Sequence, residues 1–518
     1  MKNLVSLVCV LALFQILADG AIIPESFSQL LTTRKQLEVE QVRQELGSLV
    51  SNATLIFGPE DEKYGSATTR HSTFSMPQIQ VVVMPDQESD IPAIVKYCNR
   101  NSIPFLVNNR GHGRTQSLGS FNGVQINMAR LQNISITPDA KSVWLQGGTY
   151  VGQVVHHLWD RGYVATTGSC DCVGMLGPAL GGGHGRQEGL YGMVSDNIIQ
   201  LNVVLADGTA VTVSRDSHAD LFWAMRGAGH NFGIVTSFEL KMHPRGPDTW
   251  HYHNYVWRGD KLEAVFEALN EFHGNGTTPV DMAVNFGNFY MDATVTETEP
   301  VILWSFAYRG TEEDAERHLA PFNAIEGAVR SVSGDVPLPQ ISVVQGNDVS
   351  GPACRYGLGE RLSTTAGLQV YNVTVERAIF DAFAARARSD PALAAGMSVV
   401  HEGYATAAAA AGGFAGDESA YPFRSDHHLM LATILVDGER DGSAVRDAGW
   451  EWVREVADMW NAGQPGREEH VYVNYANGFE PVEQMYGHEP WRLERLRNLK
   501  AVYDPHNRFR YYNPIIVD

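Results

Sequence analysis

The stretch Gly168-Ser169-Cys170-Asp171-Cys172-Val173-Gly174 is followed closely by Leu180-Gly181-Gly182-Gly183-His184-Gly185, and Arg110-Gly111-His112-Gly113 precedes both. The His112 and Cys170 segments each place a nucleophilic side chain in a glycine-rich turn. Glycine lets backbone N–H groups approach a ligand closely and adopt positive φ, but a plain phosphate-binding loop needs no histidine or cysteine. Together the segments predict a cofactor held by covalent bonds.

Length and charge narrow the class of protein. The 518 residues are 44% apolar, which is enough for substantial cores and is most simply divided between two globular domains. The formal net charge of -20 would repel phosphate backbones, so nucleic-acid partners are disfavoured.

Residues 1–20 are typical of a cleavable secretory signal. Lys2 is followed by an apolar run from Leu4 to Leu17 and by the small residues Ala18-Asp19-Gly20. An N-terminal membrane anchor is the alternative, but the run is short for a span of about 20 residues. We therefore expect a secreted or secretory-pathway protein that starts near Ala21 and has no membrane contact after signal removal.

Four sequons agree with the secretory route. Glycans could be attached at Asn52, Asn133, Asn275 and Asn372. Such tripeptides also arise by chance, so they support the signal without proving it.

Four cysteines remain after the signal, which is too few for a disulfide framework in a chain this long. Cys98 and Cys354 could pair, or both could be buried free thiols. Cys170 and Cys172 with His184 would supply only three ligands, whereas a closed structural zinc site needs four, so we expect no metal.

Residues 76–245 alternate short β-branched runs with helical patterns, which predicts a mixed α+β unit after an N-terminal segment at 21–75. We expect strands at 79–83, 105–107, 124–128, 142–146, 198–205 and 210–213, and helices at 91–100 and 149–161.

Residues 246–465 predict a second, antiparallel sheet with helices over one face. Strand patterns at 250–257 and 301–308 flank a helical pattern at 261–273, and Thr311-Glu312-Glu313-Asp314 is typical of a capping box that opens another helix. The alanine-rich segment at 405–416 predicts a short helix.

The C-terminal segment, 466–518, contains Tyr472-Val473-Asn474-Tyr475, which we interpret as a terminal strand. A charged helix is expected at 491–500, and Asp504-Pro505 should end it, because proline disfavours the helical conformation of the residue before it.

Several common catalytic signatures are missing. Gly111–Gln116 fails the last position of G-x-G-x-x-G, and His401-Glu402 lacks the second histidine of H-E-x-x-H. There is no G-x-S-x-G elbow and no P-loop, so Rossmann dehydrogenases, common hydrolases and metalloproteases are disfavoured.

A longer series of motifs points to one family. The motifs, in order, are Arg110-Gly111-His112, the run from Gly168 to Gly185, Tyr191-Gly192 with Asp196-Asn197, Ala206-Asp207-Gly208, Asp220 to Gly227, Asn231 to Thr236, Tyr472 to Tyr475 and Tyr503 to Phe509. This series resembles the vanillyl-alcohol-oxidase superfamily, and most closely its berberine-bridge-enzyme-like oxidases. The resemblance implies an α+β fold: a two-part FAD-binding domain of PCMH type, at 76–245 and 466–518, with an inserted antiparallel-sheet substrate domain.

The resemblance also implies covalent FAD. His112 matches the histidine that bonds the 8α-methyl group, and Cys170 matches the cysteine that bonds C6 of the ring, with Cys172 as a competing candidate. Two bonds would prevent cofactor loss outside the cell and raise the flavin potential. One bond or none stays open, because Asn109-Arg110 stands where the family commonly has Ser-Gly.

Further contacts with FAD follow from the same motifs. Backbone amides of residues 110–116 and 174–183 are expected to surround the diphosphate. The predicted cofactor-binding residues, besides His112 and Cys170, are Arg110, Gly111, Gly113, Val173, Gly174, Gly177, Gly181, Gly182, Gly183, Asp196, Gly233, Ile234 and Val235.

The chemistry is likewise carried by resemblance. Val173 occupies the family's oxygen-gating position, and a small residue there implies an oxidase that releases hydrogen peroxide. Tyr475 matches the catalytic base, which would work only if nearby positive charge or a hydrogen bond lowered its pKa from about 10. Asn474 and Tyr472 would orient flavin or substrate.

Three functional hypotheses follow. The first is an FAD-dependent oxidase of a small molecule with O2 as acceptor, in secondary-metabolite biosynthesis or acting on a carbohydrate. The second is an isomerase or cyclase that uses the flavin pocket without net oxidation, and the third is a catalytically idle binding protein. Peroxide release on turnover separates the first from the second.

Overall fold

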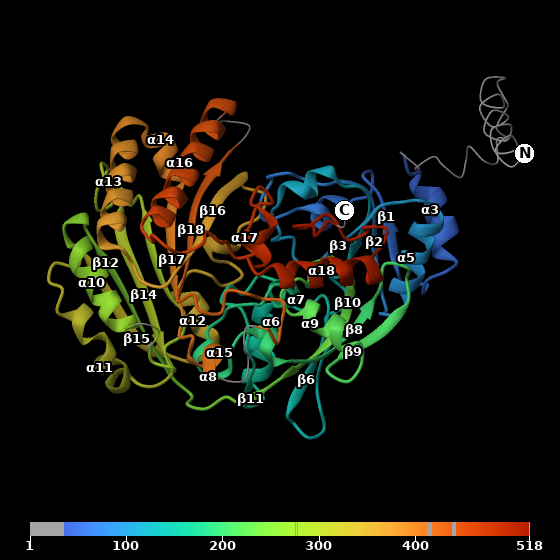
Figure 1. Ribbon diagram of the computed structural model, residues 1–518, viewed down its shortest axis with the longest axis horizontal. Coiled ribbons are helices and arrows are strands. Elements are labelled where there is room, and N and C mark those ends of the chain that lie inside the picture. The colour runs from blue at the N-terminus through green and yellow to red at the C-terminus, as the bar shows by residue number, and fades with distance from the viewer. Residues whose placement is uncertain (1–35, 275, 277, 412–416, 438–441, 517–518) are drawn as a thin grey trace, which may run out of the picture.

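The computed structural model describes residues 36–274, 276, 278–411, 417–437 and 442–516. The predicted signal peptide, its cleavage site and the sequon at Asn275 lie outside these ranges. Two units lie side by side (Figure 1), one built on two small sheets and the other on a single large sheet. This mixture of helices and sheets confirms the expected α+β class.

The first unit contains a four-stranded sheet in the order β1-β2-β4-β3 and a five-stranded sheet in the order β5-β6-β10-β8-β9. The four-stranded sheet has a parallel core, whereas the five-stranded sheet is antiparallel. The strands are β1 Leu55–Phe57, β2 Gln78–Met84, β3 Phe105–Asn108, β4 Asn122–Asn127, β5 Ile134–Ile136, β6 Ser142–Gln146, β8 Ile198–Val204, β9 Ala210–Ser214 and β10 Ile234–Lys241. All six strands expected here are confirmed, and β1, β5 and β10 are additional to them.

The parallel sheet forms because its strands are buried on both faces. Val81, Val82 and Val83 of β2 are consecutive and fully buried, as parallel strands require. Helix α5 (Asp90–Arg100) covers this sheet with an apolar stripe that includes Ile91 and Cys98. Cys98 is therefore a buried free thiol, and burial raises its pKa to about 12.

The second unit is a seven-stranded antiparallel sheet in the order β15-β12-β14-β13-β17-β18-β16. Its strands are β12 Trp250–Trp257, β13 Asn285–Tyr290, β14 Val301–Tyr308, β15 Arg330–Val336, β16 Glu360–Leu368, β17 Met397–Gly403 and β18 His428–Val436. Strands β12 and β14 are confirmed, and so is the capping box, because the Thr311 side chain accepts a hydrogen bond from the Asp314 amide. The other five strands are additional to those expected.

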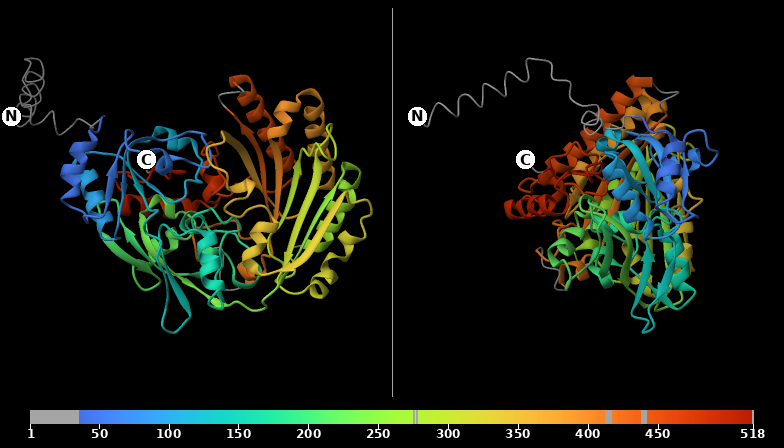
Figure 2. Two further views of the ribbon diagram at one scale, coloured as in Figure 1. Left: turned by 180° about the vertical axis from the view of Figure 1, so that it is seen from behind. Right: turned by 90° about the vertical axis from the view of Figure 1, so that its right-hand side faces the viewer.

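The short α12 (Leu338–Val344) packs against β12 on one face of this sheet, whereas most helices of the unit cover the other face (Figures 1 and 2). They are α10 Leu262–His273, α11 Glu312–Asn323, α13 Val373–Ser389, α14 Pro391–Gly396 and α16 Gly442–Ala462. Because side chains alternate along a strand, Val399 of β17 enters the core beneath these helices while Glu402 points to the opposite face. That opposite face meets the first unit.

The C-terminal segment returns to the first unit (Figure 2). Helix α18 (Pro490–Tyr503) packs Leu493 and Leu496 into the same core as β8 and β10, and it ends before Asp504 as expected. Tyr472-Val473-Asn474-Tyr475 is a turn, so the expected strand is wrong. The amides of Tyr475 and Ala476 both donate to the Tyr472 carbonyl, which closes the chain on itself instead of pairing it in a ladder.

The remaining regular elements connect these layers. They are α3 Val39–Gly47, α4 Tyr64–Thr68, α6 Val151–Trp159, β7 Tyr163–Val164, α7 Leu176–Leu180, α8 Glu188–Tyr191, α9 Ala219–Met225, β11 His243–Pro244, α12 Leu338–Val344, α15 Ala407–Ala411 and α17 Val482–Tyr486. Within the described ranges, no helix has both the length and the apolar character that crossing a membrane would need.

Candidate active site

His112 lies in the loop after β3, between two aromatic side chains. Its ring stacks on that of His71 with centroids 4.3 Å apart, and the edge of Tyr356 meets it at 5.3 Å. Burial, and then the charges of His71, Arg114 and other cations nearby, lower the pKa of His112 well below its ordinary value. The imidazole is therefore neutral at physiological pH, which is the nucleophilic form.

The Cys170 turn holds a three-sulfur cluster, here Cys170, Cys172 and Cys354. Cys172 and Cys354 form a disulfide, and the Cys170 thiol lies 3.6 Å from the first sulfur and 3.5 Å from the second. The possible Cys98–Cys354 pair is thus wrong, because Cys98 is enclosed in α5. Cys172 is no longer a competing candidate for flavin, since its sulfur is already bonded. Cys170 is the free thiol of the turn.

Hydrogen bonds join the His112 loop to the Cys170 turn. The Arg110 side chain donates to the Cys172 carbonyl at 3.2 Å, and its guanidinium lies over the ring of Tyr150. The Arg110 carbonyl accepts from the Tyr356 hydroxyl at 2.8 Å. Of the altered Asn109-Arg110 pair, Arg110 therefore ties the two predicted attachment segments together, whereas the Asn109 side chain donates to the Gly147 and Thr149 carbonyls.

Tyr475 faces a carboxylate that the sequence did not predict. Its hydroxyl donates to both oxygens of Glu402 at 3.0 Å, and the Tyr404 hydroxyl donates to one of them at 2.9 Å. Glu402 comes from β17 of the second unit and Tyr475 from the C-terminal turn, so the two units meet at this contact. Because β17 also contains Ser398 and His401, no local signal in the sequence distinguished Glu402.

The pKa of Tyr475 is raised well above 10, not lowered as its expected role required. Burial is the main cause, and the negative charge of Glu402 adds to it, while Arg114 opposes them. Tyr475 is therefore a neutral phenol that donates to a carboxylate. Burial also raises the pKa of Glu402, although its hydrogen bonds to Tyr404 and Tyr475 counteract the shift.

Tyr472 and Asn474 meet the glycine-rich run. The Asn474 side chain donates to the Pro178 carbonyl at 3.0 Å and to the Tyr472 hydroxyl at 2.6 Å, and that hydroxyl accepts from the Gly183 amide at 3.1 Å. Gly181 is required here, since a Cβ would lie 2.3 Å from the Asn474 side-chain oxygen.

The other predicted cofactor contacts lie around this centre and along β10. Val173 and Gly174 lie in the turn that enters α7, Gly177 lies within that helix, and Gly182 follows it. Gly233 lies just before β10, and Ile234 and Val235 begin it. Both of these side chains enter hydrophobic cores, so only their backbone could face a ligand.

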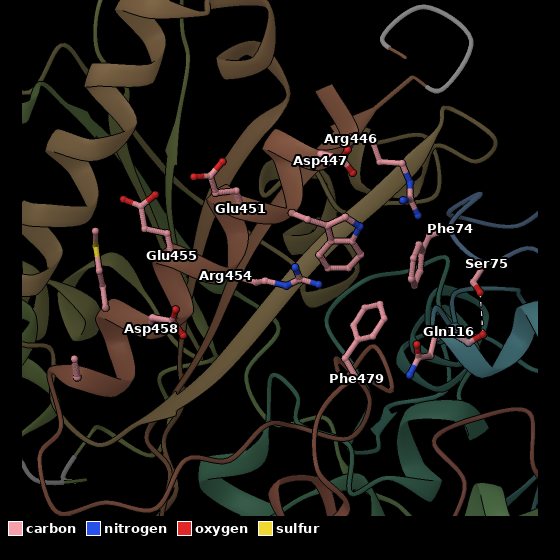
Figure 3. A pocket seen from close by; sticks show the side chains of 13 residues that line it. Phe74, Ser75, Gln116, Arg446, Asp447, Glu451, Arg454, Glu455, Asp458 and Phe479 are labelled. Carbon is pink, nitrogen blue, oxygen red and sulfur yellow. Dashed lines mark hydrogen bonds between the residues drawn. The ribbon is translucent and has the colours of Figure 1, made fainter. Parts of the chain in front are cut away.

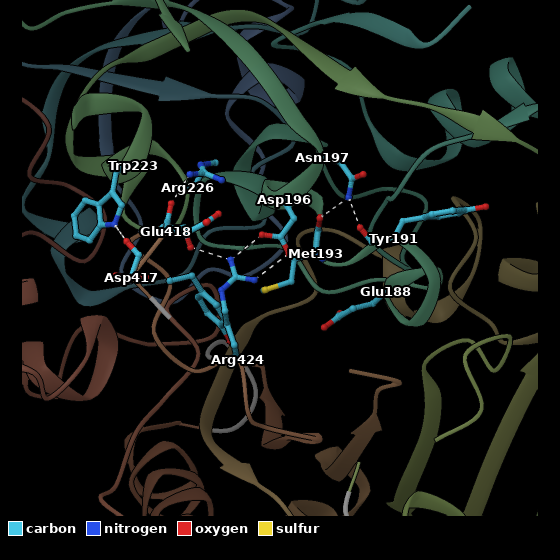
Figure 4. A network of polar contacts seen from close by, with 12 residues as sticks. Glu188, Tyr191, Met193, Asp196, Asn197, Trp223, Arg226, Asp417, Glu418 and Arg424 are labelled. Carbon is cyan, nitrogen blue, oxygen red and sulfur yellow. Dashed lines mark hydrogen bonds and ion pairs between the residues drawn. The ribbon is translucent and has the colours of Figure 1, made fainter. Parts of the chain in front are cut away.

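Asp196 forms a buried ion pair with Arg424 (Figure 4). Two hydrogen bonds of 2.7 and 3.0 Å join the guanidinium to the two carboxylate oxygens, one of which also accepts from the Met193 amide. Arg424 also donates to the Ser419 hydroxyl. These contacts fasten the segment before β18 to the first unit.

Comparison with known proteins identifies the family. Residues 79–214 match a family described as FAD binding domain, and residues 471–516 match one described as berberine and berberine like. The chain is 51% identical over 486 residues to the FAD-linked oxidoreductase anuG of Penicillium roqueforti (strain FM164), covering 94% of each chain. The chain belongs to the berberine-bridge-enzyme-like FAD-linked oxidoreductases.

Solved structures show the same fold for this oxidoreductase. Physcomitrella patens BBE-like 1 superposes with a TM-score of 0.76 at 21% identity, over 93% of this chain and all of that one. Glucooligosaccharide oxidase from Acremonium strictum superposes with a TM-score of 0.75 at 21% identity, over 91% and 99% of the two chains. The FAD of that Acremonium oxidase is described as 6-S-cysteinyl, 8α-N1-histidyl FAD.

The oxidoreductase's His112 loop fits FAD. The buried Nε2 of His112 has no hydrogen-bond partner among the described residues, and neither have the backbone amides of residues 111–115. Gly111 adopts a φ of +67°, and Arg110, Arg114 and Arg361 bring positive charge near the ring of His112. A row of free amides beside cations suits the negative charge of the cofactor's phosphates.

The raised pKa of Glu402 leads us to expect an acid limb in the pH profile of kcat/KM. Its raised pKa means that kcat/KM should fall, as pH decreases, at a pH above the ordinary carboxyl value of about 4.3. Tyr404→Phe removes a donor to the ionised form and should move the limb to higher pH, whereas Glu402→Gln should abolish it. Profiles of initial rate against pH test this; an unmoved limb in Tyr404→Phe contradicts it.

The raised pKa of Glu402 also makes the stability of the folded state depend on pH. A carboxyl whose pKa is higher in the folded state contributes stability below its unfolded pKa, and that contribution is lost as pH rises through the folded value. Ionisation of Glu402 therefore costs the folded state some stability.

A separate hollow of about 1110 Å³ lies between α16 and the first unit (Figure 3). Phe74, Trp450 and Phe479 pack together on its wall, and Arg454 lies over two of these rings. Among the described residues that line it, only Gln116 falls in a predicted cofactor segment, and its amide already donates to a backbone carbonyl. We therefore assign this hollow no part in the chemistry.

Proposed function

We propose that the protein is an FAD-dependent oxidase that removes a hydride from a small-molecule substrate. The observation that carries the proposal is the hydrogen bond of Tyr475 to both oxygens of Glu402, in a chain with an FAD-binding domain. FAD, when bound, supplies the hydride acceptor and is reoxidised by O2 with release of H2O2.

In this proposal Tyr475 and Glu402 act together as the base. The Tyr475 hydroxyl accepts the substrate's O–H or N–H proton as it passes its own proton to Glu402. A phenolate is then never required, which agrees with the raised pKa of Tyr475. Tyr404 holds the second hydrogen bond to the carboxylate and keeps it in place.

We assign His112 and Cys170 as the two attachment points of FAD. The neutral imidazole, the free thiol and the Arg110 contact between their loops support this assignment. We propose that Asp196 helps the site through its ion pair, because both of its oxygens are occupied by Arg424. Val173 is half-buried beside Cys170, as a residue that controls oxygen access would be.

The proposed setting is the secretory pathway. Asn52, Asn133 and Asn372 are exposed and open to glycosylation. Asn372 also caps α13 and donates to the Gly463 carbonyl, so a glycan there would leave one N–H of this amide to make that hydrogen bond. The substrate is proposed to be a secondary-metabolite intermediate, with an oligosaccharide as the alternative, since several proteins of the same fold are named as oligosaccharide oxidases.

Acid precipitation of the secreted protein tests the flavin assignment. We expect yellow colour in the washed pellets of the wild type, His112→Ala and Cys170→Ala, and none in the double variant, because one covalent bond is enough to retain flavin. A pellet that is colourless in the wild type contradicts covalent attachment. Peroxide formed from a candidate substrate indicates oxidation. An isomerised product that forms without peroxide indicates isomerisation.

A further inference from the structure

The three-sulfur cluster can form a disulfide in three ways, and only one of them leaves Cys170 as a thiol. The Cys170 sulfur is nearly equidistant from the other two, at 3.6 Å and 3.5 Å. A pair between Cys170 and either neighbour would remove the proposed flavin-bonding thiol. The observed pair, Cys172–Cys354, is the one that spares it.

Cys354 is brought to the cluster by a strap from the second unit, residues 345–357. The Asn347 carbonyl of the strap accepts from the Asp171 amide at 2.9 Å, and the Asn347 side-chain oxygen accepts from Arg186 at 3.1 Å. Further along, the Ala353 carbonyl contacts a ring nitrogen of His71 at 3.0 Å. Cys354 is thus placed by contacts made on both sides of the Cys170 turn.

The strap lies against both predicted attachment points. Tyr356 packs its ring on that of His112 and donates its hydroxyl to the Arg110 carbonyl. Cys354 is 6% exposed and bonded to Cys172, two residues from Cys170. A disulfide at this place therefore concerns the flavin site, and not only the stability of the chain.

We propose that Cys354 guards the Cys170 thiol: by holding Cys172 in a disulfide, it prevents Cys172 from oxidising with Cys170 and so keeps Cys170 available to bond flavin. The inference rests on the proposed attachment of FAD through Cys170. It assigns to Cys354 a positioning role for cofactor attachment.

Without Cys354, Cys170 and Cys172 can be oxidised to a disulfide by ordinary thiol chemistry. If Cys354 is absent, the two neighbouring thiols can react with a small disulfide such as oxidised glutathione. One Cys170–Cys172 bond forms, the glutathione disulfide breaks, and two protons and two electrons leave as two molecules of reduced glutathione.

The Cys170 thiol can coexist with the Cys172–Cys354 disulfide because thiol–disulfide exchange between them is slow. Burial raises the pKa of Cys170 to about 11, so little thiolate is present at neutral pH to attack the Cys172–Cys354 bond. Cys170 therefore attacks the Cys172–Cys354 disulfide only slowly.

Peptide mapping under non-reducing conditions tests the guard in full-length secreted protein. Free thiols are first alkylated. The mass of the peptide that contains Cys170 and Cys172 then shows whether it carries flavin. We expect a Cys172–Cys354 pair in the wild type and in Cys98→Ala, the matched control at a distant cysteine. In Cys354→Ser we expect loss of flavin from Cys170 and an internal disulfide, which makes the peptide lighter by two hydrogens.

The decisive variant is Cys172→Ser/Cys354→Ser. It has no disulfide, but it also has no neighbouring thiol with which Cys170 could form one, so flavin at Cys170 should return. If the double variant lacks it as the single variant does, the disulfide acts only by holding the strap and the guard is overturned. Full flavin at Cys170 in Cys354→Ser overturns it as well.

Failure of the proposed flavin attachment can be distinguished from failure of the proposal about Cys354. If wild-type Cys170 carries no flavin, the double attachment is wrong, and alkylation then reports on the guard alone. Cys170 should be alkylated in the wild type and in the double variant but protected in Cys354→Ser. Equal alkylation in all three overturns the guard.

Discussion

Tyr475→Phe should lower the rate of substrate-dependent flavin reduction by about 10²–10⁴-fold, the usual contribution of a positioned acid–base group. The variant keeps the ring but loses the hydroxyl that donates to both Glu402 oxygens. Because phenylalanine fills the same space, the fold and the bound flavin should be unchanged. Anaerobic stopped-flow bleaching of the flavin, with a substrate found by peroxide release, measures the effect.

The pairing of the two residues sharpens this test. Glu402→Gln should slow the same step, and the double variant should be no slower than the worse single variant, because both residues serve one proton path. Tyr255→Phe is a matched control: it also removes a buried hydroxyl, but one that contacts His253 and Asn323 in the core of the second unit. Multiplicative effects of Tyr475 and Glu402 would contradict a shared path.

Asp196→Asn should reduce the free energy of unfolding by about 3–5 kcal/mol, because it leaves the guanidinium of Arg424 buried without its counter-charge. The two side chains are almost entirely buried, at 0% exposure for Asp196 and 7% for Arg424. Asparagine has nearly the same size, so the loss reports the charge and not a cavity. Urea unfolding of the flavin-loaded protein measures it.

A surface pair provides the control. Glu263→Gln removes an ion pair with Arg377 in which the Glu263 side chain is 49% exposed, and it should cost no more than about 1 kcal/mol. Asp196→Asn/Arg424→Met should recover part of the loss, since the buried guanidinium is then removed together with the carboxylate that it pairs with. If Asp196→Asn costs no more than Glu263→Gln, the buried pair does not hold the segment before β18.

Local patterns were sufficient for much of the fold. The consecutive valines of β2, the apolar stripe of α5 and the capping box at Thr311 all indicate their conformation within a few residues. Strand β15 does not, because it is an edge strand whose residues are mostly exposed and include Gly334 and Asp335, so it has no apolar alternation.

The candidate site divides in the same way. His112, Cys170 and Tyr475 stand in motifs that could be recognised in the chain itself. Glu402 and Cys354 could not be assigned, because each acts through a partner that only the tertiary fold supplies; Cys354 is 182 residues from Cys172. The expectation for the pKa of Tyr475 failed for this reason, since its nearest charged partner is negative.

The order of the units along the chain has a consequence for synthesis. The seven-stranded sheet uses one continuous stretch and can fold as soon as that stretch leaves the ribosome, whereas the core around β8 and β10 needs Val471, Leu496 and Ile515 from the last part of the chain. Sheets that depend on such distant partners fold slowly and expose apolar surface while they wait. The FAD-binding unit is therefore completed only after the last part of the chain has been synthesised, later than the seven-stranded sheet.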